Sequence, residues 1–466
     1  MEKIEEEGEM KNKEKAYSIA LASTVMIIFL ILVSSMASAS SGQNPPSTTT
    51  LPSITSGAGD PSDDEVLSDE LSGEEIVTDT ESVQAAAPKI TEKRITTNTS
   101  EQWSPVIYGN KIVWHDLRNG NWDIYIYDLS TKKEISTLNA SHQWGPDIYG
   151  NRVVWTDDRN GVSEIYMQDL STKKQTRITT DTLGSWEPAI YGNKIVWTGY
   201  RDENYYGNIY IYDISTSKGK RITTDESFHF APAIYGDRIV WEDDRNGNSD
   251  IYMYDLSTSK EKRITTNESS QNFPAIYGNR IVWSDDRNGN WDIYMYDLST
   301  SKEKRITTNP SASYYPAIYG DRIAWMDDRN GNFDIYVYDL ATRQESHTTD
   351  KSDQFYPDIY GDKIVWQDYR NGNPDIYMGT LSTFPVAAFS ASPISGKAPL
   401  KVTFTDKSTG TPTSWKWSFG DKTYSTAKNP VHKYTAAGKY TVSLTVKNAV
   451  GSNTKTMSGY IKVSKK

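Results

Sequence analysis

A unit that carries the tripeptide Ile-Tyr-Gly recurs seven times along this sequence. The marker glycines are separated by 41, 42, 44, 42, 42 and 41 residues. A period in the low forties with strand-like content is typical of a four-stranded propeller blade. We therefore expect an all-β, seven-bladed propeller, with an open solenoid of the same units as the alternative. The marker glycines are Gly109, Gly150, Gly192, Gly236, Gly278, Gly320 and Gly361.

Each unit reads as four short strands separated by turns. In the first unit we expect strands over 104–108, 111–116, 123–129 and 134–138, because β-branched and aromatic residues concentrate there. The second and third strands carry bulky side chains on both faces, which is typical of a sheet covered on both sides by neighbouring blades. The Asn119-Gly120 pair between them favours a two-residue turn with positive φ.

The strand count closes only if the two ends of the repeat region meet. After the seventh unit no fourth strand follows, but a spare copy, 93–98, precedes the first unit. We expect this N-terminal strand to complete the last blade and so remove the open edges of the ring.

The repeat resembles the TolB-type propeller. The resemblance rests on Pro-x-Ile-Tyr-Gly-x-[Lys/Arg]-Ile-[Val/Ala]-Trp and on D-x-R-N-G-N-x-D-I-Y-x-Y-D-L, and it implies a propeller over 88–383. Residues 384–466 change to short alternating strands with Trp417, Gly420, Asp421 and Tyr434 in motifs that closely resemble the PKD domain, an immunoglobulin-like sandwich. That resemblance implies an extracellular spacer or adhesion module.

The N-terminal region predicts export. Residues 16–33 are uncharged and apolar, lysines precede them, and no basic residue follows until Lys89. We expect residues 1–39 to be a signal peptide cleaved near Ala39, with an uncleaved membrane anchor as the alternative. Residues 40–87 are rich in Ser, Thr, Pro and acid, so a disordered stalk is expected. The stalk's ten carboxylates account for most of the net charge of -11, so the rest of the chain is nearly neutral and has no basic face. We therefore expect no nucleic-acid partner. A membrane is expected to be contacted only through the N-terminal segment.

Acidic and basic residues flank each Asn-Gly turn. Because they recur in nearly every unit, we interpret them as a carboxylate–guanidinium clamp of the blade. A calcium loop is the alternative, although an Arg in its middle is a poor neighbour for such an ion. The pairs are Asp116 and Arg118, Asp157 and Arg159, Asp243 and Arg245, Asp285 and Arg287, Asp327 and Arg329, and Asp368 and Arg370.

An aromatic side chain precedes strand one in almost every unit. These rings either form a ligand-binding rim that stacks sugars around the channel mouth or fill the wedges between blades. The longer loop of the third unit is a candidate partner loop, or else a neutral insertion. The rim candidates are Trp103, Trp144, Trp186, Phe230, Phe273, Tyr314 and Phe355; the loop residues are Tyr200, Arg201, Tyr205 and Tyr206.

The sequence offers little for catalysis. It has no Cys, and His115, His142, His229 and His347 occupy unmatched positions, whereas TolB-like polysaccharide lyases use His-rich metal sites. We expect no catalytic residue, metal or cofactor. The predicted function is a cell-surface binding, adhesion or envelope-scaffold protein whose partners are cell-envelope proteins or glycans; a lyase-like polysaccharide-active enzyme is the alternative. Asn98, Asn139 and Asn267 lie in glycosylation sequons.

Overall fold

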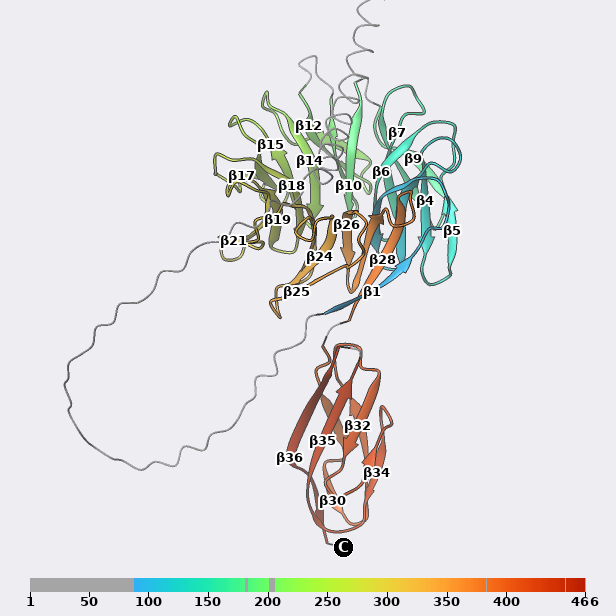
Figure 1. Cartoon of the computed structure of the whole chain (residues 1–466), viewed down its shortest axis with the longest axis vertical. Helices are drawn as coiled ribbons and strands as arrows, with labels where there is room; N and C mark the ends of the chain where they lie inside the picture. Colours follow the sequence, from blue (N-terminus) through green and yellow to red (C-terminus); the bar gives the residue numbers. More distant parts are fainter. Residues whose placement is uncertain (1–87, 181–182, 201–205, 383, 449, 466) are drawn as a thin grey trace, which may run out of the picture. The chain divides into compact units, whose positions relative to one another are not determined.

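The computed structural model describes residues 88–180, 183–200, 206–382, 384–448 and 450–465, and every regular element within these ranges is a β-strand (Figure 1). The expected signal segment and the stalk lie outside the described residues. Within the described ranges, no helix has the length and apolar character needed to cross a membrane.

Seven four-stranded antiparallel sheets lie between residues 89 and 382, and we call them blades one to seven. They confirm the propeller predicted from the repeat. Strand one of each blade contacts strand one of both neighbouring blades, so these seven strands enclose a central axis. Blade one is β2 (Gln102–Tyr108), β3 (Lys111–Asp116), β4 (Asp123–Asp128) and β5 (Lys133–Ser136); blade two is β6 (Gln143–Tyr149), β7 (Arg152–Asp157), β8 (Glu164–Asp169) and β9 (Lys174–Arg177); blade three is β10 (Ser185–Tyr191), β11 (Lys194–Gly199), β12 (Asn208–Asp213) and β13 (Lys218–Arg221). Blade four is β14 (His229–Tyr235), β15 (Arg238–Asp243), β16 (Asp250–Asp255) and β17 (Lys260–Arg263); blade five is β18 (Gln271–Tyr277), β19 (Arg280–Asp285), β20 (Asp292–Asp297) and β21 (Lys302–Arg305); blade six is β22 (Ser313–Tyr319), β23 (Arg322–Asp327), β24 (Asp334–Asp339) and β25 (Gln344–His347); blade seven is β26 (Gln354–Tyr360), β27 (Lys363–Asp368), β28 (Asp375–Ser382) and β1 (Lys89–Arg94).

Blade seven is completed by the N-terminal strand, as the strand count predicts. β1 pairs antiparallel with β28, from Lys89 opposite Ser382 to Arg94 opposite Tyr377, and the two strands lie side by side in Figure 1. The Arg94 guanidinium also pairs with the buried Asp375 carboxylate at 2.8 Å. The ring is therefore closed by strands that lie far apart in the sequence.

Both faces of the middle strands are buried, which also agrees with the sequence pattern. Ile112, Val113 and Trp114 of β3 are all fully buried, although adjacent residues of a strand point to opposite faces. The same position in strand two of every blade holds a fully buried Trp. Neighbouring blades therefore cover each other with a continuous apolar layer, which supplies most of the driving force for closing the ring.

The marker tyrosines form a second closed ring around the axis. Each tyrosine of the Ile-Tyr-Gly motif contacts the corresponding tyrosine of the next blade, with ring centroids 4.6 to 4.8 Å apart. The tyrosines of the repeated motif therefore narrow the central channel at the face where strands one and two are joined by turns. The members are Tyr108, Tyr149, Tyr191, Tyr235, Tyr277, Tyr319 and Tyr360.

The expected two-residue turn at Asn119-Gly120 is wrong. β3 ends at Asp116 and β4 begins at Asp123, so residues 117–122 form the connection, in which Gly120 alone has positive φ (90°). The Asn119 side chain explains the difference, because its Nδ2 donates to the Asp123 carboxylate and to the Tyr125 hydroxyl. Fixing these partners requires a wider loop than the two-residue turn.

Residues beyond 384 form the expected β-sandwich with a core of its own. Trp417, Phe404 and Tyr434 are fully buried between its two sheets. One sheet has the order β29-β31-β34 and the other β30-β36-β35-β32-β33. The strands are β29 (Phe389–Ser392), β30 (Ser395–Lys397), β31 (Leu400–Asp406), β32 (Ser414–Ser418), β33 (Tyr424–Ser425), β34 (Val431–Tyr434), β35 (Gly438–Lys447) and β36 (Ser452–Ser464).

Candidate functional site

Two sets of loops meet on one face of the propeller. The loops between strands two and three contact the segments that lead into strand one of the next blade: Asn121 Nδ2 donates to the backbone oxygens of Asn139 and Ser141. The Asp-x-Arg pairs lie in the same loops and form the predicted clamp. In blade five, Arg287 donates to both carboxylate oxygens of the buried Asp285, and its guanidinium lies 4.3 Å from the centre of the Tyr294 ring.

The predicted rim residues lie near this face but differ in their surroundings. Trp103 contacts Trp122 at a centroid distance of 5.9 Å. Tyr314 lies between Trp291 and Phe333. These loop aromatics therefore pack largely against one another. Of the remaining candidates, Phe355 is buried, Trp144 and Trp186 are half-buried, and Phe230 keeps 36% of its surface exposed.

Phe273 belongs to a different set. In every blade a bulge interrupts strand one just before its proline, and the residue in that bulge has a positive φ between 46° and 58°. We call this set the bulge ring, because strand one is the innermost strand of each blade. Its members are Ser104, Gly145, Glu187, Ala231, Phe273, Tyr315 and Tyr356.

The bulge ring is asymmetric, unlike the scaffold that carries it. Blades five to seven contribute an aromatic arc: Phe273 stacks on Tyr315 with centroids 3.9 Å apart, and Tyr315 meets Tyr356 edge-on at 5.0 Å. Blades one and two contribute only Ser104 and Gly145. A repeated backbone thus presents large rings on one side of the axis and little bulk on the other.

Two glutamates lie beside the aromatic arc. Glu187 accepts a hydrogen bond from the backbone N–H of Ala231 at 2.9 Å, and Glu242 accepts one from the N–H of Phe273 at 2.6 Å. Desolvation raises the pKa of Glu242 to about 8. Glu187 is partly exposed to solvent, but desolvation by the surrounding protein also raises the pKa of its carboxyl group.

Two further carboxyl groups lie on strand one beyond the bulge ring. Asp147 accepts hydrogen bonds from the N–H groups of Ile148 and Ile190, and Asp358 is held in the same way by Ile359 and Ile107. Desolvation raises the pKa of Asp147 to about 6 and that of Asp358 to about 7. Each carboxyl bridges its own blade to the next.

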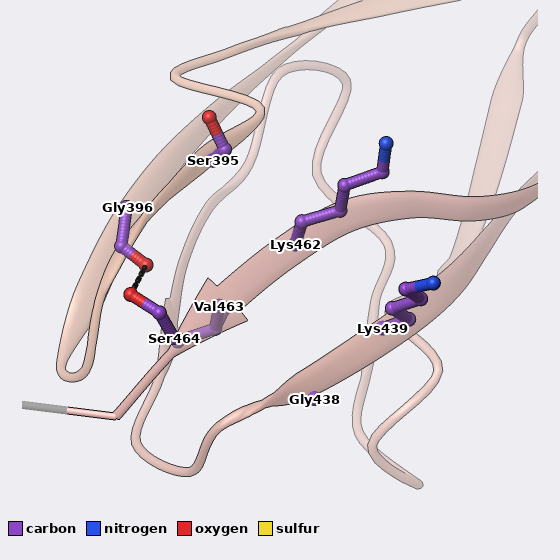
Figure 2. Close-up of a pocket in the computed structure, with 7 residues that line it drawn as sticks. All are labelled: Ser395, Gly396, Gly438, Lys439, Lys462, Val463 and Ser464. Carbon is purple, nitrogen blue, oxygen red and sulfur yellow. Dashed lines mark hydrogen bonds between the residues drawn. The ribbon is translucent and has the colours of Figure 1, made fainter.

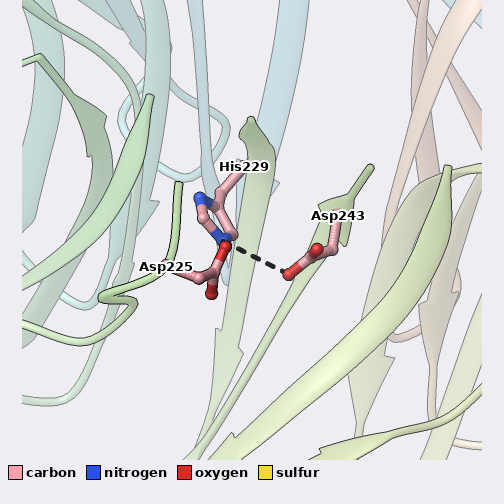
Figure 3. Close-up of side chains that lie close together, drawn as sticks. All are labelled: Asp225, His229 and Asp243. Carbon is pink, nitrogen blue, oxygen red and sulfur yellow. Dashed lines mark ion pairs between the residues drawn. The ribbon is translucent and has the colours of Figure 1, made fainter. Parts of the chain in front are cut away.

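At the start of blade four the structure brings a histidine and two aspartates together, which the sequence analysis did not predict (Figure 3). His229 is fully buried; its Nε2 lies 3.2 Å from Asp225 and 3.3 Å from Asp243, and its Nδ1 lies 2.8 Å from the backbone oxygen of Gly207. These three side chains have the spacing of metal ligands. However, Arg245 already pairs with both carboxylates, and acceptors face both ring nitrogens. This arrangement fits an imidazolium better than a metal ligand, which must be neutral.

The other predicted positions are only partly described. Arg201 and Tyr205 of the candidate partner loop lie outside the described residues. Tyr200 meets Trp186 edge-on at 5.1 Å, and Tyr206 meets Phe228 at 5.1 Å. The sequon residues Asn98, Asn139 and Asn267 are half-buried, and each accepts a hydrogen bond from the N–H two residues later.

The sandwich has an open recess of about 580 Å³ near its C-terminal strand (Figure 2). Lys439 of β35 and Lys462 of β36 are register partners there, and Ser464 Oγ donates to the backbone oxygen of Gly396. Both lysines are exposed, so solvent screens their repulsion.

Sequence reasoning therefore missed the bulge ring, Glu242 and the His229 cluster. A signal for the bulge ring was present in the residue just before the strand-one proline. When the seven units are aligned on that proline, this column reads Ser, Gly, Glu, Ala, Phe, Tyr, Tyr, while the proline is invariant and the preceding column is aromatic in six of the seven units.

Comparisons with known proteins agree with this fold. Residues 184–357 match the TolB beta propeller domain family, and residues 384–463 match the PKD domain family. No curated protein matches the chain. Among solved structures, an oligogalacturonate lyase in complex with manganese has a TM-score of 0.51 at 15% identity, over 64% of this chain and 95% of that one. The chain is also similar to TolB from Acinetobacter baumannii, with a TM-score of 0.40 at 19% identity, over 51% of this chain and 62% of that one. The β-propeller domain of the Trilobed protease from Pyrococcus furiosus has a TM-score of 0.49 at 14% identity, over 62% of this chain and 96% of that one. At these identities the likeness concerns the fold alone.

Proposed function

Because this chain combines a TolB-type β-propeller with a C-terminal PKD domain, we propose that it is a cell-surface interaction protein. In this proposal the propeller binds a cell-envelope protein or glycan through its loop face, and the PKD domain acts as a spacer or adhesion module. The role is binding and not turnover of the ligand.

One observation carries the proposal: the bulge ring departs from the repetition of its scaffold. Residues that serve the blade recur in nearly every blade, as the clamp aspartates and the buried tryptophans do. The bulge ring instead places aromatic rings in blades five to seven and glutamate in blade three. A single ligand on the axis of a sevenfold ring would select such one-sided chemistry, because it meets each blade differently.

The test is retention of envelope material on the immobilised full-length protein. Tyr315→Leu and Tyr356→Leu should reduce retention of protein or glycan at least tenfold without changing the melting temperature by more than a few degrees. Tyr424→Leu is the matched control, because Tyr424 lies in the PKD domain with 65% of its surface exposed. Equal retention by all variants contradicts the proposal, and release of shortened polysaccharide from the column replaces it with an enzyme.

A further inference from the structure

We propose that the bulge ring binds a primary ammonium group, such as a lysine side chain of a polypeptide partner, between Glu187, Glu242 and the aromatic arc. This inference rests on the proposed function, since it names the chemistry of the ligand at the same ring. Three independent features of the described residues support it.

The first feature is the missing counter-ion of the two glutamates. Among the described residues, Glu187 and Glu242 form no ion pair with Lys or Arg, and their hydrogen bonds come from backbone N–H groups and the Thr198 hydroxyl. The clamp aspartates differ, because each pairs with an arginine. Without a cation beside them the charged forms of both carboxyl groups are disfavoured, in agreement with their raised pKa values. An ammonium ligand would supply this cation.

The second feature is the aromatic arc. Phe273, Tyr315 and Tyr356 form a contiguous set of rings, and Glu242 accepts a hydrogen bond from the backbone N–H of Phe273, so this acid reaches the aromatic arc. A cation close to an aromatic face is attracted by the negative charge density of the ring face. Rings and carboxylates together therefore favour a cation over a neutral group or an anion.

The third feature is a group of buried polar side chains without partners. Glu242 occupies the second-last position of its strand two and reaches the bulge of the following blade. Ser284, Thr156 and His115 occupy the same position in blades five, two and one; they are at least nine-tenths buried and have an N or O atom without a hydrogen-bond partner among the described residues. Such atoms are rare and mark places where water or a ligand completes the bonding.

Ammonium binding should also release a proton. The pKa of Glu242 is about 8, so this carboxyl is largely protonated at pH 7 when the ring is empty. The titratable groups around it are Glu187 and Tyr315, whose pKa values are also raised, with Asp147 and Asp358 farther along strand one. Binding of a cation favours the carboxylate form, so affinity should rise with pH, by about tenfold per unit below pH 8.

The experiment is a calorimetric titration of the full-length protein, in chelator, with Nα-acetyl-lysine N-methylamide. The neutral probe Nα-acetyl-norleucine N-methylamide is the ligand control. The lysine probe should bind at least tenfold more tightly than the norleucine probe, and Glu187→Gln and Glu242→Gln should each abolish most of this difference. Glu268→Gln is the matched control, because Glu268 is an exposed acid in the segment before strand one of blade five. It should leave affinity unchanged.

The possible outcomes separate the two proposals. Equal affinity for both probes, or binding that does not change in Glu187→Gln and Glu242→Gln, overturns the ammonium inference. The proposed function survives that result if envelope material is still lost with Tyr315→Leu. If neither tyrosine variant nor glutamate variant affects retention, both proposals fail. In a folded Glu242→Gln protein, a pH slope equal to that of the wild type also contradicts the assigned role of Glu242.

Discussion

At the scale of single residues, this propeller uses the same side chains for the scaffold many times and changes a few for other purposes. Position one of strand one illustrates this difference. It holds a buried Gln in blades one, two, five and seven and a buried Ser in blades three and six, but His229 in blade four. Burial opposes the charged imidazolium. The hydrogen bonds to Asp243 and Gly207, together with the charges of Asp243 and Asp225, outweigh burial and raise the pKa of His229.

We therefore expect the stability contributed by His229 to depend on pH. Because its folded-state pKa lies above the ordinary value of 6.5, the contribution is complete below about pH 6.5 and is lost as pH rises through the folded-state pKa. The variant His229→Gln introduces the side chain that blades one, two, five and seven carry at this position. Urea unfolding from pH 5.5 to 9 should show the largest deficit of the variant at the acid end. A deficit independent of pH would contradict the imidazolium assignment.

At the scale of elements, the closing strand β1 is the part of the ring that depends on distant sequence. It supplies the only hydrogen-bonded neighbour on the outer side of β28 among the described strands. Ile90 packs against the core of blades six and seven, and Arg370 pairs with Glu92 at 2.7 Å. Without β1, the backbone groups along the edge of β28 would be exposed to water, and the contacts of Ile90 and Glu92 would be lost.

Deletion of residues 88–99 from the full chain should therefore lower the melting temperature and expose β28 to hydrogen exchange. A synthetic peptide of residues 88–99 added in trans should restore part of the lost stability, because strand pairing is non-covalent. The same peptide with Ile90→Lys should restore less, since its apolar contact is gone. A deletion variant with unchanged melting and exchange would show that β1 contributes little to closure.

At the scale of the whole molecule, the propeller and the PKD domain have separate apolar cores. The PKD core contains Trp417, whose Nε1 donates to the backbone oxygen of Ala427 at 2.9 Å, and no propeller residue belongs to the same cluster of buried side chains. The propeller instead distributes its apolar residues over the contacts between adjacent blades. Each part thus buries its own apolar surface.

Two unfolding transitions should follow from these separate cores. Trp417→Ala should lower the free energy of unfolding of the PKD domain by about 3–5 kcal/mol, because it removes a large buried ring. The propeller transition should stay within error of the wild type in calorimetry. The converse variant Trp283→Ala, in the propeller, should shift only the other transition. A single transition that moves with both variants would contradict independent unfolding.

The number of blades, the closing strand and the Asp–Arg clamp could be predicted from the sequence, because they follow from local patterns that repeat with a fixed period. The expected turn at Asn119-Gly120 failed for a local reason: a side chain took partners across the loop. Which side chains meet around the axis depends on the closed ring, and no local pattern predicts it. Glu187, Glu242 and Tyr315 come from three blades, and each is unremarkable in its own unit. Their common position arises because a closed ring converts one column of the repeat into a circle, and this closure is a property of the whole chain.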